Sequence, residues 1–271
     1  DVRSPAAIVR LLSNPRHDHT YSALMLRTLL IALAVVFLAP LAAHGVWWQF
    51  QNQPASWSTA DWSSAGILPA ARAAPEAVVH VMAGRTGRWK GIFAHHTWIV
   101  VKPAGASRYT RYDVVGWGQA LRTDNYPPDG RWYSNTPEIV LTLRGEAATR
   151  AIPLIRQAVA QYPHGARGAY VIWPGPNSNT FVATVARLVP ELAPALLPTA
   201  IGKDFAGWPL YAGASPSRTG VQLSLGGLLG VTLGWVEGLE VNVLGLVAGL
   251  DVRRPALKLP GWGRIGWPPA A

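Results

Sequence analysis

A long apolar run dominates the first part of the chain and predicts a helix that spans a membrane. Residues 24–46 (LMLRTLLIALAVVFLAPLAAHGV) hold only two ionisable side chains, Arg27 and His44. As a helix the run is about 35 Å long, which exceeds a hydrocarbon core of about 30 Å. Arginines precede the run and two tryptophans follow it. We therefore predict a cytoplasmic tail over residues 1–23 and a transmembrane anchor over residues 24–48, with the N-terminus inside.

A cleavable secretory signal is the alternative interpretation of the same run. With Met25 as the start, a short basic region, an apolar stretch and a Leu41-Ala42-Ala43 cleavage site would follow in the order of a signal peptide. The pair Trp47-Trp48 favours a retained anchor, because Trp settles at the membrane interface. A buried helix of a soluble protein is a third interpretation. Under the first two, the bulk of the chain is exported.

The pattern changes twice after the anchor. Residues 49–75 are rich in Ser, Pro and Ala with little periodicity, which indicates a linker that we expect to lie along the membrane surface. Residues 76–212 alternate between β-branched or aromatic runs and turn signals, which predicts a core domain of strands and helices. Strands are predicted over residues 77–82, 93–102, 108–115, 138–143 and 169–173, a surface loop over 116–137, and helices over 145–162 and from Ser178.

The C-terminal extension, residues 213–271, is apolar and rich in Gly. Within residues 220–250 only Glu237 and Glu240 are charged, so a second membrane helix is one interpretation. Period-two alternation around Val221 and Leu239, together with frequent Gly that weakens a helix, favours short strands joined by Gly turns, lying on the membrane.

Composition narrows the function classes. The chain of 271 residues has a net charge of +10, only 14% charged residues and no Cys, which excludes disulfides, Cys zinc sites and a Cys nucleophile. The basic residues are dispersed and do not interleave with stacking aromatics on one element, so we predict no nucleic-acid partner. A basic surface facing anionic lipid or cell-wall polymer fits as well as a merely solvated surface. No residue pattern indicates a metal or a cofactor.

Three short segments carry candidate chemistry. His95 and His96 lie on a predicted strand, where successive side chains face opposite sides, so only one can point into a given site. Ser178 lies at a predicted helix start, whose positive end assists a nucleophile and an oxyanion, although a plain N-cap explains the same residues. Asp113 on the next strand is a candidate to orient a histidine, with a surface ion pair as the simpler interpretation. The candidate binding residues around them are Asn177, Asn179, Trp98, Trp173 and Arg111.

The order of these segments resembles the circularly permuted branch of the NlpC-type papain-like hydrolases, in which a histidine strand precedes the helix that carries the nucleophile. His96-Thr97-Trp98 matches the histidine strand, and Asn177-Ser178 with Phe181 matches the start of the nucleophile helix. The resemblance implies an α+β fold with a permuted papain-like core and a mostly antiparallel sheet. This chain has Ser178 where the family has Cys, and Ser needs stronger assistance from a base.

From Met25 onwards the chain also resembles bacterial envelope proteins of unknown function. The shared segments are PASWSTADWSS, GRWKGIFAHHTWIVVKP, DVVGWG, RWYSN, WPGPNSNTF, GKDF and RRPALKLPGWGRIG. This resemblance implies an inner-membrane or exported bacterial protein. Together with the predicted orientation of the anchor, we expect a bacterial inner-membrane protein with its main domain in the periplasm. Two functions stay open: an amide or ester hydrolase or acyltransferase acting on peptidoglycan or lipid, and a non-catalytic module that binds membrane lipid or cell-wall polymer.

Overall fold

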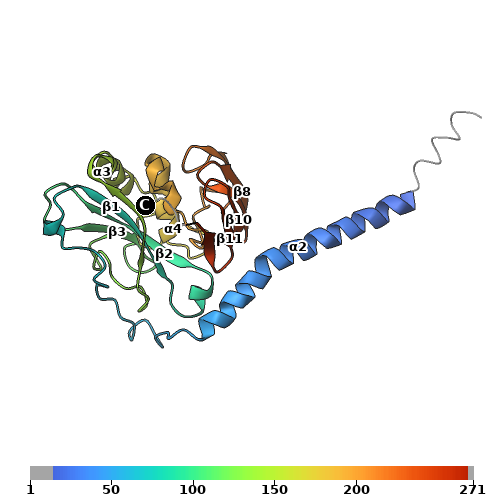
Figure 1. Ribbon diagram of the computed structural model, residues 1–271, viewed down its shortest axis with the longest axis horizontal. Helices are drawn as coiled ribbons and strands as arrows, with labels where there is room; N and C mark the ends of the chain where they lie inside the picture. Colours follow the sequence, from blue (N-terminus) through green and yellow to red (C-terminus); the bar gives the residue numbers. More distant parts are fainter. Residues whose placement is uncertain (1–14, 268–271) are drawn as a thin grey trace, which may run out of the picture.

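The computed structural model describes residues 15–267 and shows an α+β protein in three parts (Figure 1). A long N-terminal helix leads into a five-stranded antiparallel sheet that carries two helices, and a seven-stranded antiparallel sheet follows. The predicted α+β class, the N-terminal apolar helix and the C-terminal strands are confirmed.

Helix α2 (Pro15–Gln49) contains the predicted anchor at residues 24–48 and begins before it. Its stretch Tyr21–Gln49 is long and apolar enough to cross a membrane, and most of its large apolar side chains are exposed. Figure 1 shows the helix extending well away from the sheets.

The last turns of α2 are fixed to the rest of the protein. The indole N–H of Trp48 donates to the carbonyl oxygen of Arg88 at 2.8 Å, beside the short helix η2 (Arg88–Ile92). A second hydrogen bond has its acceptor on the helix: the indole N–H of Trp262, in the C-terminal part of the chain, donates to the carbonyl oxygen of Pro40 in α2 at 2.8 Å. The helix also contacts strands of the C-terminal sheet. The orientation of α2 relative to the sheets is therefore set by side-chain contacts as well as by the chain itself.

The five-stranded sheet has the order β4-β3-β2-β1-β5. One of its faces packs against α3 and α4 through Ile99, Val101, Ile155 and Phe181, which are fully buried. The other face carries Met82, Trp98 and Val100. The elements are β1 (Val78–Arg85), β2 (His95–Lys102), β3 (Thr110–Val114), β4 (Leu121–Thr123), β5 (Glu138–Arg144), α3 (Gly145–Ala160), α4 (Ser178–Leu188) and η3 (Pro190–Ala195).

Three segments show features that the sequence did not predict. The predicted surface loop 116–137 contains a short strand, β4, and the buried Trp132. The linker contains a short helix, η1 (Ala71–Ala73), and is bonded to the core domain, where Asp129 accepts hydrogen bonds from the Ser64 hydroxyl and the Ile67 N–H at 2.6 and 2.9 Å. It therefore packs on the second face of the sheet. Residues 169–173 form no strand, because the Val171 N–H donates to Pro176 within the same loop at 2.8 Å and closes a turn.

The seven-stranded sheet is a meander in sequence order from β6 to β12. It begins inside the predicted core domain, since its first strand starts at Leu210. Its inner face is polar and meets the core domain, where Gln222 and Asn242 donate to Asp204 at 3.0 and 2.8 Å. Its strands are β6 (Leu210–Ala214), β7 (Gly220–Leu225), β8 (Leu229–Gly234), β9 (Gly238–Val243), β10 (Leu246–Asp251), β11 (Ala256–Leu259) and β12 (Gly263–Gly266).

Candidate functional site

A buried His–Asp–Arg cluster lies on neighbouring strands β2 and β3. The Nε2 atom of His96 and the Oδ1 atom of Asp113 are 2.8 Å apart. The other carboxylate oxygen of Asp113 accepts hydrogen bonds from Nε and Nη2 of Arg111 at 3.1 and 2.5 Å. All three side chains are buried, so the Asp113–Arg111 pair is not the surface ion pair of the simpler interpretation. Asp113 is thus positioned to orient the ring of His96.

Tryptophan rings enclose this cluster. The ring of Trp132 stacks on His96 with centroids 3.6 Å apart and planes at 7°. The Arg111 guanidinium lies 4.1 Å from the ring centroid of Trp98, whose indole N–H donates to Pro128 at 2.8 Å. These aromatic faces shield the charges from water and strengthen the electrostatic interactions among them.

The surroundings determine the protonation state of the cluster. Burial lowers the pKa of His96, and the nearby Asp113 only partly offsets that effect, so the imidazole is neutral at physiological pH. Burial opposes ionisation of the Asp113 carboxyl, but Arg111 and His96 outweigh it and hold its pKa below the ordinary value. The pair is therefore a neutral imidazole held by a carboxylate, which is the state a general base requires.

Ser178 is the first residue of α4, and the residue before it is the N-cap. The side-chain oxygen of Asn177 accepts from the N–H groups of Asn179 and Thr180 at 2.9 and 3.1 Å, and the Thr180 hydroxyl accepts from the Asn177 N–H at 3.1 Å. Capping is therefore carried out by Asn177 and Thr180, a capping box, and the Ser178 hydroxyl is not needed for it.

Tyr170 lies close to both Ser178 and Asp113. Burial together with the negative charge of Asp113 raises the pKa of Tyr170 to about 12, and the nearby Ser178 side chain opposes this shift in part. Within residues 15–267, no hydrogen bond joins Ser178 directly to His95 or His96. Pairing of Ser178 with a histidine remains a prediction.

The other candidate residues are held by their own partners. His95 faces away from His96: its Nδ1 lies 2.7 Å from the Thr199 hydroxyl and its Nε2 lies 3.9 Å from the Glu138 carboxylate. Asn179 accepts from the Thr97 hydroxyl at 2.8 Å and donates to the carbonyl oxygen of His95 at 2.9 Å. Both bonds fasten the start of α4 to β2.

Trp173 is half exposed and lies away from the cluster. Its indole N–H donates to the carbonyl oxygen of Leu244 at 2.9 Å, in the turn between β9 and β10. It therefore joins the core domain to the seven-stranded sheet.

A cleft of about 1000 Å³ lies between β5, η3 and the inner face of the seven-stranded sheet. Leu141, Leu143 and Leu197 line its apolar side, whereas Glu240, Lys258 and Arg264 line its polar side. His95 also lines it, but Ser178 and His96 do not. The cleft and the His96 cluster are therefore separate features.

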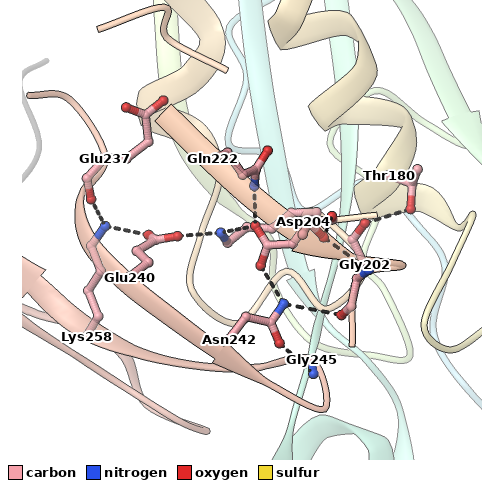
Figure 2. A network of polar contacts seen from close by, with 12 residues as sticks. Thr180, Gly202, Asp204, Gln222, Glu237, Glu240, Asn242, Gly245 and Lys258 are labelled. Carbon is pink, nitrogen blue, oxygen red and sulfur yellow. Dashed lines mark hydrogen bonds and ion pairs between the residues drawn. The ribbon is translucent and has the colours of Figure 1, made fainter. Parts of the chain in front are cut away.

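A network of buried charges forms the polar side of the cleft (Figure 2). Glu240 binds both Lys258 and Lys203, and Lys203 also binds Asp204 at 2.9 Å. Burial opposes ionisation of Glu240, but the two lysines outweigh it and lower its pKa to about 2. Burial also opposes the charge on Lys203, and its carboxylate partners reverse the effect and raise its pKa. Each of these four side chains has an opposite charge in contact, so none of them is buried as an uncompensated charge at the junction between the two sheets.

Sequence analysis missed the residues that connect these features. Trp132 and Tyr170 lie in segments predicted as a loop and a strand, and no local pattern marks them as neighbours of His96 and Ser178. Lys203 and Asp204 lie in the GKDF segment, where no local pattern indicates that both side chains are buried. The polar residues at alternate positions of β7 to β11 were the available signal for a polar inner face.

Comparison with known proteins finds a match for one segment of the chain, and that match is to a family model. No curated protein and no solved structure matches the chain. The matched segment covers the five-stranded sheet, α3, α4 and residues Lys203 and Asp204, and ends before the seven-stranded sheet. Residues 76–205 match the family described as "Protein of unknown function (DUF3750)" and so carry a domain of unknown function on a chain with one helix able to span a membrane.

Proposed function

We propose that this chain is a membrane-anchored acyl hydrolase or acyltransferase of the bacterial envelope, with Ser178 as nucleophile, His96 as base and Asp113 as the residue that orients the base. The observation that carries the proposal is the buried contact of 2.8 Å between His96 Nε2 and Asp113 Oδ1. A carboxylate on one ring nitrogen fixes the orientation of the imidazole and leaves Nδ1 to exchange a proton with substrate.

The chemistry follows from these roles. The Ser178 oxygen attacks the carbonyl carbon of an amide or ester while its proton passes to Nδ1 of His96. The same proton then passes to the leaving amine or alcohol, and an acyl-serine forms. Water completes hydrolysis, and an acceptor hydroxyl or amine completes transfer. The positive end of α4, where Ser178 lies, favours the oxyanion of the intermediate.

Tyr170 lies beside the nucleophile in this mechanism. No hydrogen bond joins Ser178 to His96 among the described residues, so the Ser178 hydroxyl must turn towards His96 before it can be deprotonated. Because the raised pKa keeps Tyr170 protonated, its phenol stays neutral throughout. Tyr170 is a positioning residue in this proposal.

The location and substrate class rest on the sequence. Arg16 and Arg27 lie before or within the apolar helix and Trp47-Trp48 at its other end, which favours a cytoplasmic N-terminus and a periplasmic main domain. Amides of peptidoglycan peptides and esters of membrane lipids are the acyl compounds within reach of a domain placed there.

The first experiment is covalent labelling of the full-length protein with a fluorophosphonate, followed by mass spectrometry of the labelled peptide. We expect label on Ser178, at least tenfold less label in Asp113→Asn, and none in Ser178→Ala or His96→Gln. Ser217→Ala is the matched control, because this buried serine is bonded to Glu237 at 2.7 Å and lies outside the cluster. A folded protein that takes no label at Ser178 would overturn the proposal.

A second candidate function is a non-catalytic module that holds an amphiphile in the cleft. The observation in its favour is that the cleft of about 1000 Å³ has an apolar and a charged side and excludes Ser178 and His96. Native mass spectrometry of the purified full-length protein tests it. A bound lipid that is lost in Leu197→Trp, which fills the cleft, and kept in Ser178→Ala would support this function.

A further inference from the structure

The seven-stranded sheet carries its polar side chains inside and its apolar side chains outside. Gln222, Glu240 and Lys258 on the inner face are buried. Their neighbours along the strands point the other way: Val221 is 63% exposed and Leu239 is 38% exposed. An antiparallel sheet of a soluble protein has the opposite arrangement, with the apolar face on the core and the polar face in water.

The register makes the outer face uniformly apolar. Cross-strand partners share a face, and Val221, Leu233 and Leu239 follow one another across β7, β8 and β9. Leu250 and Leu257 continue the same row onto β10 and β11. Every outward position of β6 to β12 is Gly, Ala, Val, Leu or Ile. We call this surface the outer face.

The outer face is at the upper end of the apolar patches found on soluble monomers. Seven strands spaced about 4.8 Å apart and about 20 Å long give roughly 600 Å², and patches of this size are often functional. The polar inner face, with its ion pairs and hydrogen bonds, fixes which side of the sheet meets the core domain. The sheet therefore cannot bury the outer face by turning over.

Helix α2, which is long and apolar enough to span a membrane, lies next to this face. The helix contacts β10 and β11 of the same sheet, and the turn before β12 is bonded to it through Trp262 and Pro40. Figure 1 shows α2 leaving the molecule on the side where the seven-stranded sheet lies. Within residues 15–267, α2 is the one helix able to span a membrane. Because α2 contacts the seven-stranded sheet, lipid around α2 would lie beside that sheet.

Tryptophans mark both ends of the strands. Trp235 and Trp267 lie at one end of the sheet, after β8 and β12, and Trp208 and Trp262 lie at the other end, before β6 and β12. Trp235, Trp208 and Trp267 are 60–72% exposed. Tryptophan is enriched where a protein surface passes from hydrocarbon to water, so these positions frame a lipid-facing surface.

We infer that the outer face of the seven-stranded sheet lies in the leaflet from which α2 emerges, with its Leu, Val and Ile side chains in the lipid. The depth is limited to the side chains, about 5–10 Å, because the free backbone groups of edge strands β6 and β12 need water. The inference is independent of the proposed chemistry at Ser178.

Depth-dependent quenching tests the inference on the full chain. The sequence has no Cys, so Val231→Cys on the outer face and Arg150→Cys on the exposed side of α3 each give one labelling site. Each variant carries an NBD fluorophore and is reconstituted as one chain per nanodisc of phosphatidylcholine and phosphatidylglycerol. Iodide quenches fluorophores in water, and doxyl-labelled lipid quenches those in the bilayer. The same measurement with a label at Leu223→Cys, also on the outer face, shows whether the result at position 231 holds for the face as a whole.

We expect doxyl lipid to quench the label at 231 at least twofold more strongly than the label at 150, and iodide to show the reverse order. Equal quenching of both labels by iodide would overturn the inference, because the outer face would then be in water. Protection of position 231 from both quenchers would also overturn it, since protein and not lipid would cover the face. One chain per disc excludes a second copy as that cover.

Discussion

Asp113 and Arg111 form an ion pair that is almost completely removed from water. A buried ion pair adds little net stability, because the cost of removing two charges from water offsets their attraction. The pair is nevertheless bonded to a third polar group, His96, and covered by Trp98. A cluster of this kind is explained better by the orientation it imposes on His96 than by stability.

Replacing one charge of this pair has a large expected cost. In Asp113→Asn the Arg111 guanidinium loses its only carboxylate among the described residues, and we expect the free energy of unfolding to fall by about 3–5 kcal/mol. Chemical denaturation of the full-length protein in detergent measures this free energy of unfolding. Glu146→Gln is the control, since Glu146 is almost fully exposed on α3 and should change stability by less than about 0.5 kcal/mol. A loss below about 1 kcal/mol in Asp113→Asn would mean that water reaches Arg111.

Asn177 caps helix α4, and the adjacent Ser178 is the proposed nucleophile. The Asn177 side chain caps two N–H groups of α4 and donates to the carbonyl oxygens of Ile172 and Ile201 at 3.1 and 3.0 Å. We expect Asn177→Ala to lower the free energy of unfolding by about 2 kcal/mol, measured by thermal denaturation. Ser178→Ala should lower it by clearly less, because Ser178 makes no capping bond. Equal losses of stability in the two variants would show that both side chains stabilise the start of α4.

At the scale of elements, the sequence predicted those whose signals are local. The apolar run at residues 24–46, the pattern of residues 93–102 and the capping residues at the helix start near Ser178 each mark an element without help from distant residues. Residues 169–173 look like a strand but find no neighbouring strand, since the loop bonds to itself. The stack of Trp132 on His96 joins a loop to a strand, and no sequence period encodes such a contact.

The seven-stranded sheet depends on its buried charges. In Glu240→Gln, Lys258 loses its only carboxylate partner in the described part of the chain, whereas Lys203 keeps Asp204. We expect the free energy of unfolding to fall by about 3 kcal/mol. Intrinsic tryptophan fluorescence, recorded during denaturation, measures this change. The double variant Glu240→Leu with Lys258→Met removes both charges and should recover most of that loss. No recovery would show that the hydrogen bonds around Glu240, and not charge pairing, hold the sheet.

At the scale of the whole molecule, several neutral histidines make stability depend on pH. Burial lowers the pKa of His80 to about 4, with a further contribution from Arg144, and burial also lowers the pKa of His95 and His96. The unfolded chain binds protons at these positions below about pH 6.5, while the folded protein does not. The unfolded state therefore binds more protons in that range, and the free energy of unfolding falls as the pH falls from about 6.5 towards 4.

His80 offers the clearest test of this dependence, because it lies apart from the candidate site. Its Nδ1 is 2.9 Å from the Thr142 hydroxyl on β5, and Tyr109 lies near its ring. We expect the wild-type protein to lose stability steadily between pH 6.5 and 4, and His80→Gln to remove at most about 3 kcal/mol of that loss. Denaturant unfolding at a series of pH values measures both curves. Parallel curves would mean that His80 is protonated in the folded protein, so that the acid sensitivity belongs to His95 and His96 on β2.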